Sequence, residues 1–385
     1  MNSERDLTVI ANSGTDSTNM SGGDRFFIEY AKVWSKSNKV TILACRELAE
    51  ICDRENLECR IVYLSRITVQ KFGLYCAYFF RIVKSLFVRP KLADDELIFS
   101  SSDFLPDVLP AFLYKATQSK RKWFAALHLL AQNPFARETA FNARSVFYFW
   151  SQRIAILMMK WCADKICVVN KSDAGVLSNK YRIPMSKIMM IRPGVTIPPV
   201  VESSTIQYDG CFVGRFHKQK GIPELLQIWK EVCRTKKDAK LAIIGRGEQV
   251  WQDLIKNFIK NNQLDENIVM LGFQDGLEKI KVMQMSRVFL FPSNYESFGI
   301  VGLEALACGI PVVSFDLDVF KEIFGDVFTM VRTGDIEAFA NKVIALLDDN
   351  ELLARKKSSG LAFAQLYDWS HGANEVLAEF ISKDQ

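Results

Sequence analysis

The sequence has 385 residues, which predicts two to three domains at roughly 150 residues per domain. Hydrophobic residues make up 49% and charged residues 24%, a globular composition that argues against a disordered chain. None of the nine cysteines forms a Cys-x-x-Cys pair, and only three histidines are present. These counts argue against a structural zinc site and against a multi-histidine metal centre.

The net charge of +5 hides an asymmetry between the two halves of the chain. Residues 1–200 carry 28 Lys and Arg against 18 Asp and Glu, whereas residues 201–385 carry 21 against 26. Halves of opposite sign indicate two domains with different partners. The basic half could face nucleic acid, an anionic membrane or a phosphorylated acceptor.

In the N-terminal half, short apolar segments alternate with segments of helical length. This alternation is typical of a doubly wound parallel sheet in an α/β fold. The predicted strands are Leu7–Ala11, Val40–Ala44, Ile61–Leu64, Leu97–Ser100, Trp123–Leu127 and Ile166–Val169, and the predicted helices are Asp24–Lys36, Pro106–Thr117 and Ser172–Lys180.

Two aromatic-rich stretches of this half, residues 72–88 and 146–161, lie in a span (60–192) that holds 21 Lys and Arg against 8 Asp and Glu. Neither stretch has the about 18 uninterrupted apolar residues of a membrane-spanning helix, and the polar residues 1–7 lack the core of a signal peptide. Two interpretations stay open. Both stretches are buried helices of the N-terminal domain, or both are interfacial helices that lie on lipid.

After a proline-rich segment, residues 192–204, the alternation restarts, so we interpret this segment as a domain linker. Ligands of such sheets bind at the carboxyl ends of the strands, and a cleft between two domains is the default active site. The second set of predicted strands is Gly210–Val213, Leu241–Ile244, Ile268–Leu271, Val288–Phe291 and Val312–Ser314, and the predicted helices are Ile222–Arg234, Gln249–Asn261, Gly299–Ala307 and Asp335–Leu347.

A glycine- and lysine-rich segment, residues 214–221, follows the first of these strands. Gly214 lets the chain turn sharply, so that Arg215 and Lys220 can converge on one anion. The forked donors of an arginine and the point charge of a lysine suit a pyrophosphate. The alternative is a solvated basic turn.

Two acidic residues surround the start of the helix that is predicted from Gly299. Free amides at that helix start make an anion site, which Glu296 precedes and Glu304 follows. Glu304 is the only charged residue from Ser297 to Phe315, and an unpartnered carboxylate in so apolar a run costs several kcal/mol. The hydroxyls of a sugar nucleotide would satisfy both carboxylates. In the alternative, Glu296 is a surface cap and Glu304 pairs with a buried arginine.

The adjacent Gly22 and Gly23, between the first strand and the first helix, allow the backbone to approach a phosphate or a sugar closely. This segment is not the dinucleotide fingerprint G-x-G-x-x-G. Residues 245–250 have Val250 where the third glycine should be. A nicotinamide enzyme is therefore disfavoured.

Together these segments resemble the group 1 glycosyltransferases, also called family 4, which are retaining enzymes with the GT-B fold of two Rossmann-like domains facing across a cleft. The resemblance is highly specific over most of residues 208–350 and looser over residues 1–200. It implies an N-terminal acceptor-side domain (1–195), a C-terminal nucleotide-sugar domain (196–367) and a last helix (368–385) that packs back on the first domain. The matching motifs are GG (22–23), GRFHKQKG (214–221), IIGRGE (243–248), MLGF (270–273) and FPSNYESFGIVGLEALACGIPVV (291–313).

The resemblance also implies roles for single residues. Arg215 and Lys220 would bind the donor diphosphate, Glu296 the hydroxyls of the donor sugar, and Glu304 the ribose. His128 would lie beside the donor sugar, with a packed histidine as the alternative. The backbone amides of residues 298–300 would contact the phosphate or the sugar. Residues 272–273 would lie near the base, and residues 22–23 would line the reacting centre. The full implied set is Arg215, Lys220, Glu296 and His128 for catalysis, and Gly22, Gly23, Gly214, Gly272, Phe273, Ser297, Phe298, Gly299, Ile300 and Glu304 for donor binding.

The implied activity is transfer of a sugar from a UDP- or GDP-sugar to a glycan or lipid-linked acceptor, as in synthesis of the cell envelope. No cofactor, metal or nucleic acid is expected. Asp316 and Asp318 look like a metal-binding Asp-x-Asp, but Arg215 and Lys220 would already neutralise the diphosphate. The alternatives are another GT-B enzyme, such as an epimerase, and a non-catalytic nucleotide- or glycan-binding module. The expected location is cytoplasmic, peripheral at the inner face of the cell membrane if the aromatic stretches lie on lipid.

Overall fold

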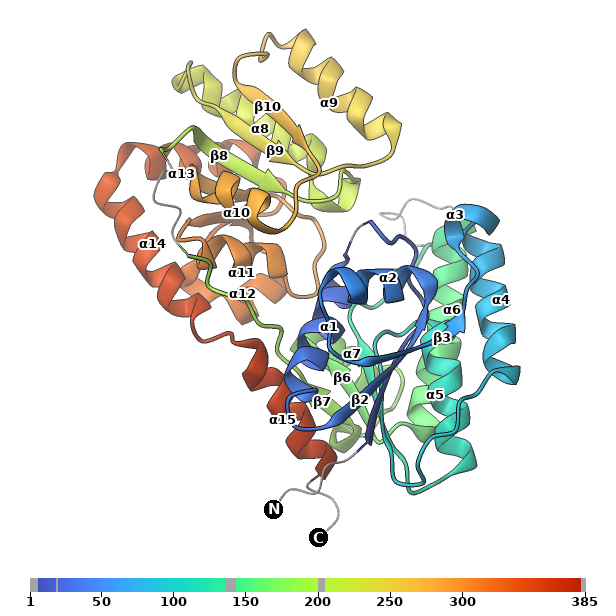
Figure 1. Ribbon diagram of the computed structural model, residues 1–385. Helices are drawn as coiled ribbons and strands as arrows, with labels where there is room; N and C mark the ends of the chain where they lie inside the picture. The colour runs from blue at the N-terminus through green and yellow to red at the C-terminus, as the bar shows by residue number, and fades with distance from the viewer. Residues whose placement is uncertain (1–5, 19, 136–142, 200–204, 382–385) are drawn as a thin grey trace. The chain divides into compact units, whose positions relative to one another are not determined.

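The computed structural model describes residues 6–18, 20–135, 143–199 and 205–381 (Figure 1). The chain divides into two compact units: unit 1 is Met1–Gly194 with Trp369–Gln385, and unit 2 is Val195–Asp368. Each unit is built on one sheet of parallel strands covered by helices. The fold class predicted from the sequence, two doubly wound α/β domains, is therefore confirmed.

Unit 1 has seven strands in the order β3-β2-β1-β4-β5-β6-β7. Chain order runs outward from β1 in one direction and from β4 in the other, so the loops after β1 and β4 lie at the switch point where ligands of such sheets bind. The strands are β1 (Asp6–Ala11), β2 (Lys39–Cys45), β3 (Arg60–Ser65), β4 (Leu97–Ser100), β5 (Lys122–Leu127), β6 (Lys165–Val168) and β7 (Ile188–Met190).

Helices cover both faces of this sheet because its strands carry apolar side chains on both sides. Phe99 of β4 packs against Trp34 of α1. The preceding residue, Ile98, points to the other face of the sheet, where it lies in an apolar cluster with residues of α5 and α6. The helices of unit 1 are α1 (Gly22–Trp34), α2 (Arg46–Arg54), α3 (Val69–Phe72), α4 (Leu74–Phe87), α5 (Leu105–Thr117), α6 (Ala143–Cys162), α7 (Lys171–Asn179) and α15 (Trp369–Ile381).

Helix α15 follows unit 2 in the sequence but belongs to unit 1, where it lies along α1 (Figure 1). The Trp369 ring lies 5.7 Å from the Phe26 ring, edge to face. The indole nitrogen of Trp34 donates to the carbonyl of Ala373 (2.8 Å), and the Phe380 and Phe124 rings stack at 3.6 Å. An aromatic surface of α1 and β5 is thereby buried under α15.

Unit 2 has six strands in the order β10-β9-β8-β11-β12-β13, again with a switch point, here between β8 and β11. Its strands are β8 (Tyr208–Val213), β9 (Leu241–Ile244), β10 (Ile268–Gly272), β11 (Ser286–Phe291), β12 (Val312–Phe315) and β13 (Thr329–Val331). Its helices are α8 (Ile222–Thr235), α9 (Gln249–Asn261), α10 (Gly276–Gln284), α11 (Ile300–Ala307), α12 (Asp318–Ile323), α13 (Ile336–Asp348) and α14 (Asn350–Ala364).

The structure also contains elements that the sequence patterns did not indicate. Strands β7 and β13 have three residues each, too few for an apolar run to stand out, and both lie at a sheet edge. The stretch 72–88 is not one helix, because Gly73 breaks it at φ +75°, a conformation that glycine adopts without strain. No helix within the described ranges is long and apolar enough to cross a membrane.

Candidate functional site

An ion pair joins the loops after β8 and β11 in unit 2. The Lys220 ammonium lies 2.5 Å from Oε1 of Glu296, and the Ser293 hydroxyl donates to the same oxygen at 2.9 Å. The side chains of Lys220 and Glu296 are 21% and 10% exposed. The structure thus brings two of the predicted catalytic residues together and fixes the carboxylate from two sides.

Further hydrogen bonds hold these two loops against each other. The amide of Asn294 donates to the Gln219 carbonyl (2.8 Å), and the Gln219 side-chain amide donates to the Tyr295 carbonyl (2.9 Å). Gly221 allows the approach: its φ is +70°, and a Cβ there would lie 1.8 Å from the carbonyl oxygen of Pro292. A glycine is therefore required for the backbone geometry of this site.

Arg215 lies in the same loop as Lys220, directly after Gly214, but the surroundings of its charge differ. Its side chain is exposed, and no carboxylate within the described part of the chain forms an ion pair with it. The positive charge of Arg215 is therefore available to an anionic ligand, whereas that of Lys220 is already opposed by Glu296.

Helix α11 begins beside this ion pair. Gly299 is its N-cap residue at φ +95°, and Ile300 is its first residue. The preceding Phe298 is buried against Phe324 and Tyr367, which fixes the entry of the chain into the helix. The first amides of a helix have no partner within the helix, so this end can accept a phosphate or a hydroxyl.

Glu304, one turn further along α11, has a lysine partner that the sequence analysis did not identify. The Lys279 ammonium, from α10, lies 2.9 Å from each carboxylate oxygen of Glu304. The alternative weighed from the sequence was a buried arginine. A carboxylate can accept about four hydrogen bonds, so Glu304 keeps capacity for the hydroxyls of a ligand.

An exposed aromatic ring follows β10. Gly272 turns the chain at φ +69°, and the ring of Phe273 is 43% exposed. The guanidinium of Arg246, from the loop after β9, lies 5.1 Å from the centroid of this ring, in cation–π geometry. An aromatic ring with an arginine beside it suits a stacked heterocyclic base.

The pair Asp316 and Asp318 does not present two free carboxylates. Asp316 accepts from the amide of Thr333 (2.9 Å) and pairs with Lys321 at 3.0 Å. Partial burial opposes ionisation of Asp316, but these hydrogen bonds outweigh it and lower its pKa. Among the described residues, no group of three or more His, Cys, Asp or Glu side chains is placed to hold a metal ion.

In unit 1, the structure brings Gly22, Gly23 and His128 together. A Cβ on Gly23 would lie 3.0 Å from Cδ2 of His128, so glycine lets α1 begin against the imidazole. Nε2 of His128 lies 2.8 Å from the carbonyl oxygen of Ser101. Since a carbonyl can only accept, Nε2 donates in this contact, which leaves Nδ1 free of this hydrogen bond.

Two buried carboxylates support the loops around His128. Asp103 accepts from the Gln152 amide (2.6 Å) and the backbone amide of His128 (3.4 Å), and its burial raises its pKa. Asp107 accepts from the amide of Asn12 (2.6 Å) and from three serine hydroxyls, and burial raises its pKa to about 6. These bonds fix the ends of β1 and β4 at the switch point.

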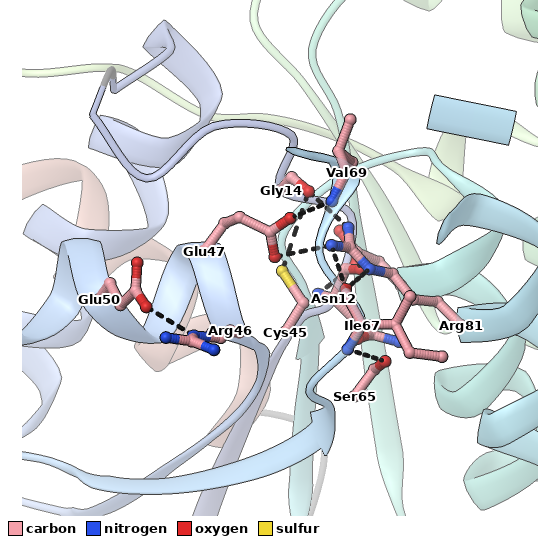
Figure 2. Close-up of polar contacts among 11 residues, drawn as sticks. Asn12, Gly14, Cys45, Arg46, Glu47, Glu50, Ser65, Ile67, Val69 and Arg81 are labelled. Atoms are coloured by element: carbon pink, nitrogen blue, oxygen red, sulfur yellow. Dashed lines mark hydrogen bonds and ion pairs between the residues drawn. The ribbon is translucent and has the colours of Figure 1, made fainter. Parts of the chain in front are cut away.

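A buried ion pair fixes the loop that leads from β1 to Gly22 (Figure 2). Arg81 of α4 donates to Glu47 of α2 (2.7 Å) and to the carbonyls of Ile67 (2.9 Å) and Gly14. The amide of Val69 donates to the other oxygen of Glu47 (2.8 Å). Arg81 and Glu47 are almost fully buried, so one guanidinium joins α2, α4 and two loops.

The chain shows clear similarity to known proteins. Residues 201–361 match the family model described as Glycosyl transferases group 1, which confirms the family resemblance of the motifs. A segment of 170 residues is 35% identical to the phosphatidyl-myo-inositol mannosyltransferase of Mycobacterium leprae, covering 43% of this chain and 44% of that protein. A segment of 142 residues is 32% identical to the N-acetyl-alpha-D-glucosaminyl L-malate synthase of Bacillus anthracis, covering 36% of each. The matches thus span less than half the length of these two relatives.

Solved structures match over nearly the whole chain. HepE of Anabaena, in complex with UDP and glucose, matches with a TM-score of 0.74 at 16% identity, over 98% of this chain and 100% of that one. The sucrose-phosphate synthase of Thermosynechococcus elongatus matches with a TM-score of 0.74 at 17% identity, over 98% and 99%. At such identities the likeness shows the fold, and it confirms the predicted GT-B architecture.

Proposed function

With residues 201–361 identified as a group 1 glycosyltransferase domain, we propose that this protein transfers a sugar, with retention, from a nucleotide-sugar donor to an acceptor hydroxyl. The observation that carries the proposal is the arrangement around Lys220. A fixed lysine–carboxylate pair, an exposed Arg215 that forms no ion pair among the described residues, and the first turn of α11 all follow strands at the switch point of unit 2.

In this proposal the diphosphate of the donor binds Arg215, Lys220 and the first amides of α11. Glu296, held by Ser293 and Lys220, accepts hydrogen bonds from the hydroxyls of the donor sugar. Both cations stabilise the negative charge that develops on the leaving phosphate, a contribution that positioned charges make to catalysis. As the bond from C1 to the phosphate oxygen breaks, the acceptor oxygen attacks C1 from the same face, and its proton passes to the leaving phosphate.

The rest of the donor extends over the ends of β9 and β10. Glu304, oriented by Lys279, binds the ribose hydroxyls, and Phe273 with Arg246 provides the surface for the base of a UDP- or GDP-sugar. The binding of UDP by HepE, which shares the fold, supports a nucleoside diphosphate in this position.

Unit 1 would supply the acceptor side, with Gly22, Gly23 and Nδ1 of His128 near the reacting centre. A relative named as a phosphatidyl-myo-inositol mannosyltransferase supports a lipid-linked acceptor and a role in synthesis of the cell envelope at the cytoplasmic face of the membrane. The rival enzyme, an epimerase, would release an isomerised sugar nucleotide. A transferase instead yields the sugar joined to an acceptor with the anomeric configuration of the donor.

A thermal-shift screen with UDP, GDP, ADP and their sugar conjugates tests the donor site. We expect one nucleotide series to stabilise the protein, by about 2.7 kcal/mol at 100 times its dissociation constant. Glu304→Gln should weaken this stabilisation because it removes the charge that Lys279 orients for the ribose. No stabilisation by any nucleotide would contradict the proposal.

Transfer is expected to survive chelation of divalent metals. Arg215 and Lys220 provide the positive charge that a metal supplies in other transferases, and Asp316 is held by Lys321 and Thr333. Turnover measured with and without EDTA should agree. Loss of turnover in EDTA with recovery on addition of Mn²⁺ would show that the Asp316 region holds a catalytic metal.

A further inference from the structure

Helix α4 has one buried and one exposed apolar face. Its buried face carries Ala77, Tyr78, Arg81 and Ser85. The opposite face is exposed over the whole length of the helix although it is apolar, and Phe87 at its end is 80% exposed. Monomeric proteins rarely leave contiguous apolar surface of this kind open to water unless it binds something. The exposed apolar residues of α4 are Tyr75, Phe79, Phe80, Leu86 and Phe87, and Phe72 of the adjoining α3 is exposed as well.

Helix α6 carries a second exposed apolar stripe. Trp150, Ile154, Leu157 and Trp161 recur at the spacing of one helical face, and Trp161 is 70% exposed. The two helices contact each other near their N-terminal ends, where the Tyr75 ring lies 5.3 Å from the Phe147 ring of α6. We call these two exposed faces together the aromatic face of unit 1.

The charged residues within α4 and α6 are all basic. The sequence has no acidic residue between Glu58 and Asp94, nor between Glu138 and Asp164. Exposed cations on or beside α4 are Lys71, Lys84, Arg89 and Lys91. Aromatic and aliphatic side chains flanked by lysine and arginine are the composition of a surface that enters the boundary of an anionic bilayer.

We propose that the aromatic face of unit 1 docks on an anionic lipid bilayer. A second copy of the chain fits this face poorly, because a two-fold contact would place the same basic groups against each other. A bilayer offers anionic head groups to the lysines and an apolar boundary to the rings. The proposal deepens the proposed function, since it puts the acceptor-side unit on the surface that holds a lipid-linked acceptor.

Co-sedimentation of the full chain with vesicles tests the proposal. Binding to vesicles of phosphatidylcholine and phosphatidylglycerol is expected at low salt, with little binding to phosphatidylcholine alone. Binding should fall as the Debye length shrinks from about 10 Å at 0.1 M salt to about 3 Å at 1 M. Equal binding to both vesicle types, or no binding to anionic vesicles at low salt, would overturn the proposal.

Variants locate the bound surface. The triple change Phe79→Ser, Phe80→Ser and Phe87→Ser is expected to lower the partition coefficient on anionic vesicles at least about tenfold, and Lys84→Glu with Lys91→Glu should do the same. The matched control is Val250→Ser with Leu277→Ser, two comparably exposed apolar residues of unit 2 (63% and 64%), which should bind as the unaltered protein does. Retained binding in both test variants would contradict the assignment.

Two further measurements distinguish the bilayer proposal from a failure of the donor site and from dimerisation. Donor stabilisation, measured without vesicles, should be unchanged in the aromatic variant, so a failed donor site and a failed bilayer surface give different results. Sedimentation velocity without lipid should show a monomer. A dimer that the Phe79, Phe80 and Phe87 changes dissociate would assign the face to a second copy and overturn the bilayer.

Discussion

Replacing Arg215 or Lys220 with Ala is expected to lower turnover by 10²-fold or more, which corresponds to about 2.7 kcal/mol of transition-state stabilisation. The cations act where the leaving diphosphate gains negative charge, so their loss is felt more in the transition state than in the bound donor. Lys220→Ala has a second effect, because it leaves Glu296 with Ser293 as its remaining partner among the contacts described above. The measurement is kcat with saturating donor and acceptor.

Lys218→Ala is the matched control for this experiment. Lys218 is an exposed lysine of the same loop, two residues from Lys220, and we assign its side chain no role in the site. Its replacement should leave turnover near that of the unaltered protein. If Arg215→Ala and Lys220→Ala also turned over at that rate, the donor site would have to lie elsewhere.

Arg81→Met is expected to lower the free energy of unfolding of unit 1 by about 3–5 kcal/mol. Removing one partner of a buried ion pair leaves the other charge uncompensated, and within the described part of the chain Glu47 would keep the amide of Val69 as its hydrogen-bond donor. The carbonyls of Gly14 and Ile67 would lose their donor in the same step. Thermal unfolding followed by circular dichroism should show a decrease in Tm of roughly 10 °C.

Two comparisons show whether the charge causes this loss. The double variant Arg81→Met with Glu47→Gln should recover part of the stability, because no unpaired charge is then buried. Arg46→Met removes an exposed ion pair within α2, the helix that carries Glu47. Figure 2 shows this pair, Arg46–Glu50, beside the buried pair. Such pairs contribute little, so this variant should unfold almost as the unaltered protein does.

The parts of the site that could be predicted from the sequence are those in which local geometry dictates the residue. Gly299 has positive φ directly before α11, and the sequence placed the start of a helix at this glycine. Gly221 has positive φ directly before α8, but the sequence analysis assigned the turn of this loop to Gly214, whose φ is not positive. The strands β8 and β11 were predicted because both faces of a parallel sheet are buried, which makes their sequences continuously apolar. Lys220 and Glu296 were singled out as charges at the ends of these strands.

The parts that could not be predicted depend on contacts between distant segments. Lys279 lies in α10, whose sequence does not mark it as a site residue, and its contact with Glu304 of α11 is seen only in the folded structure. Arg81 and Lys84 are both basic residues of one aromatic stretch, yet the first is buried and the second exposed. Residue type alone does not separate them, because the difference is set by Glu47, which is 34 residues away.

The return of α15 to unit 1 has a consequence for the order in which the protein is built. During synthesis from the N-terminus, all of unit 2 leaves the ribosome before residues 369–381 do. Until then Phe26, Tyr30 and Phe124 lack the aromatic partners that α15 provides. Unit 2, which is continuous in the sequence, can complete its core first, whereas unit 1 displays an uncovered aromatic surface for the time that about 170 residues take to emerge. Such an uncovered aromatic surface exposes the nascent chain to aggregation and to capture by chaperones.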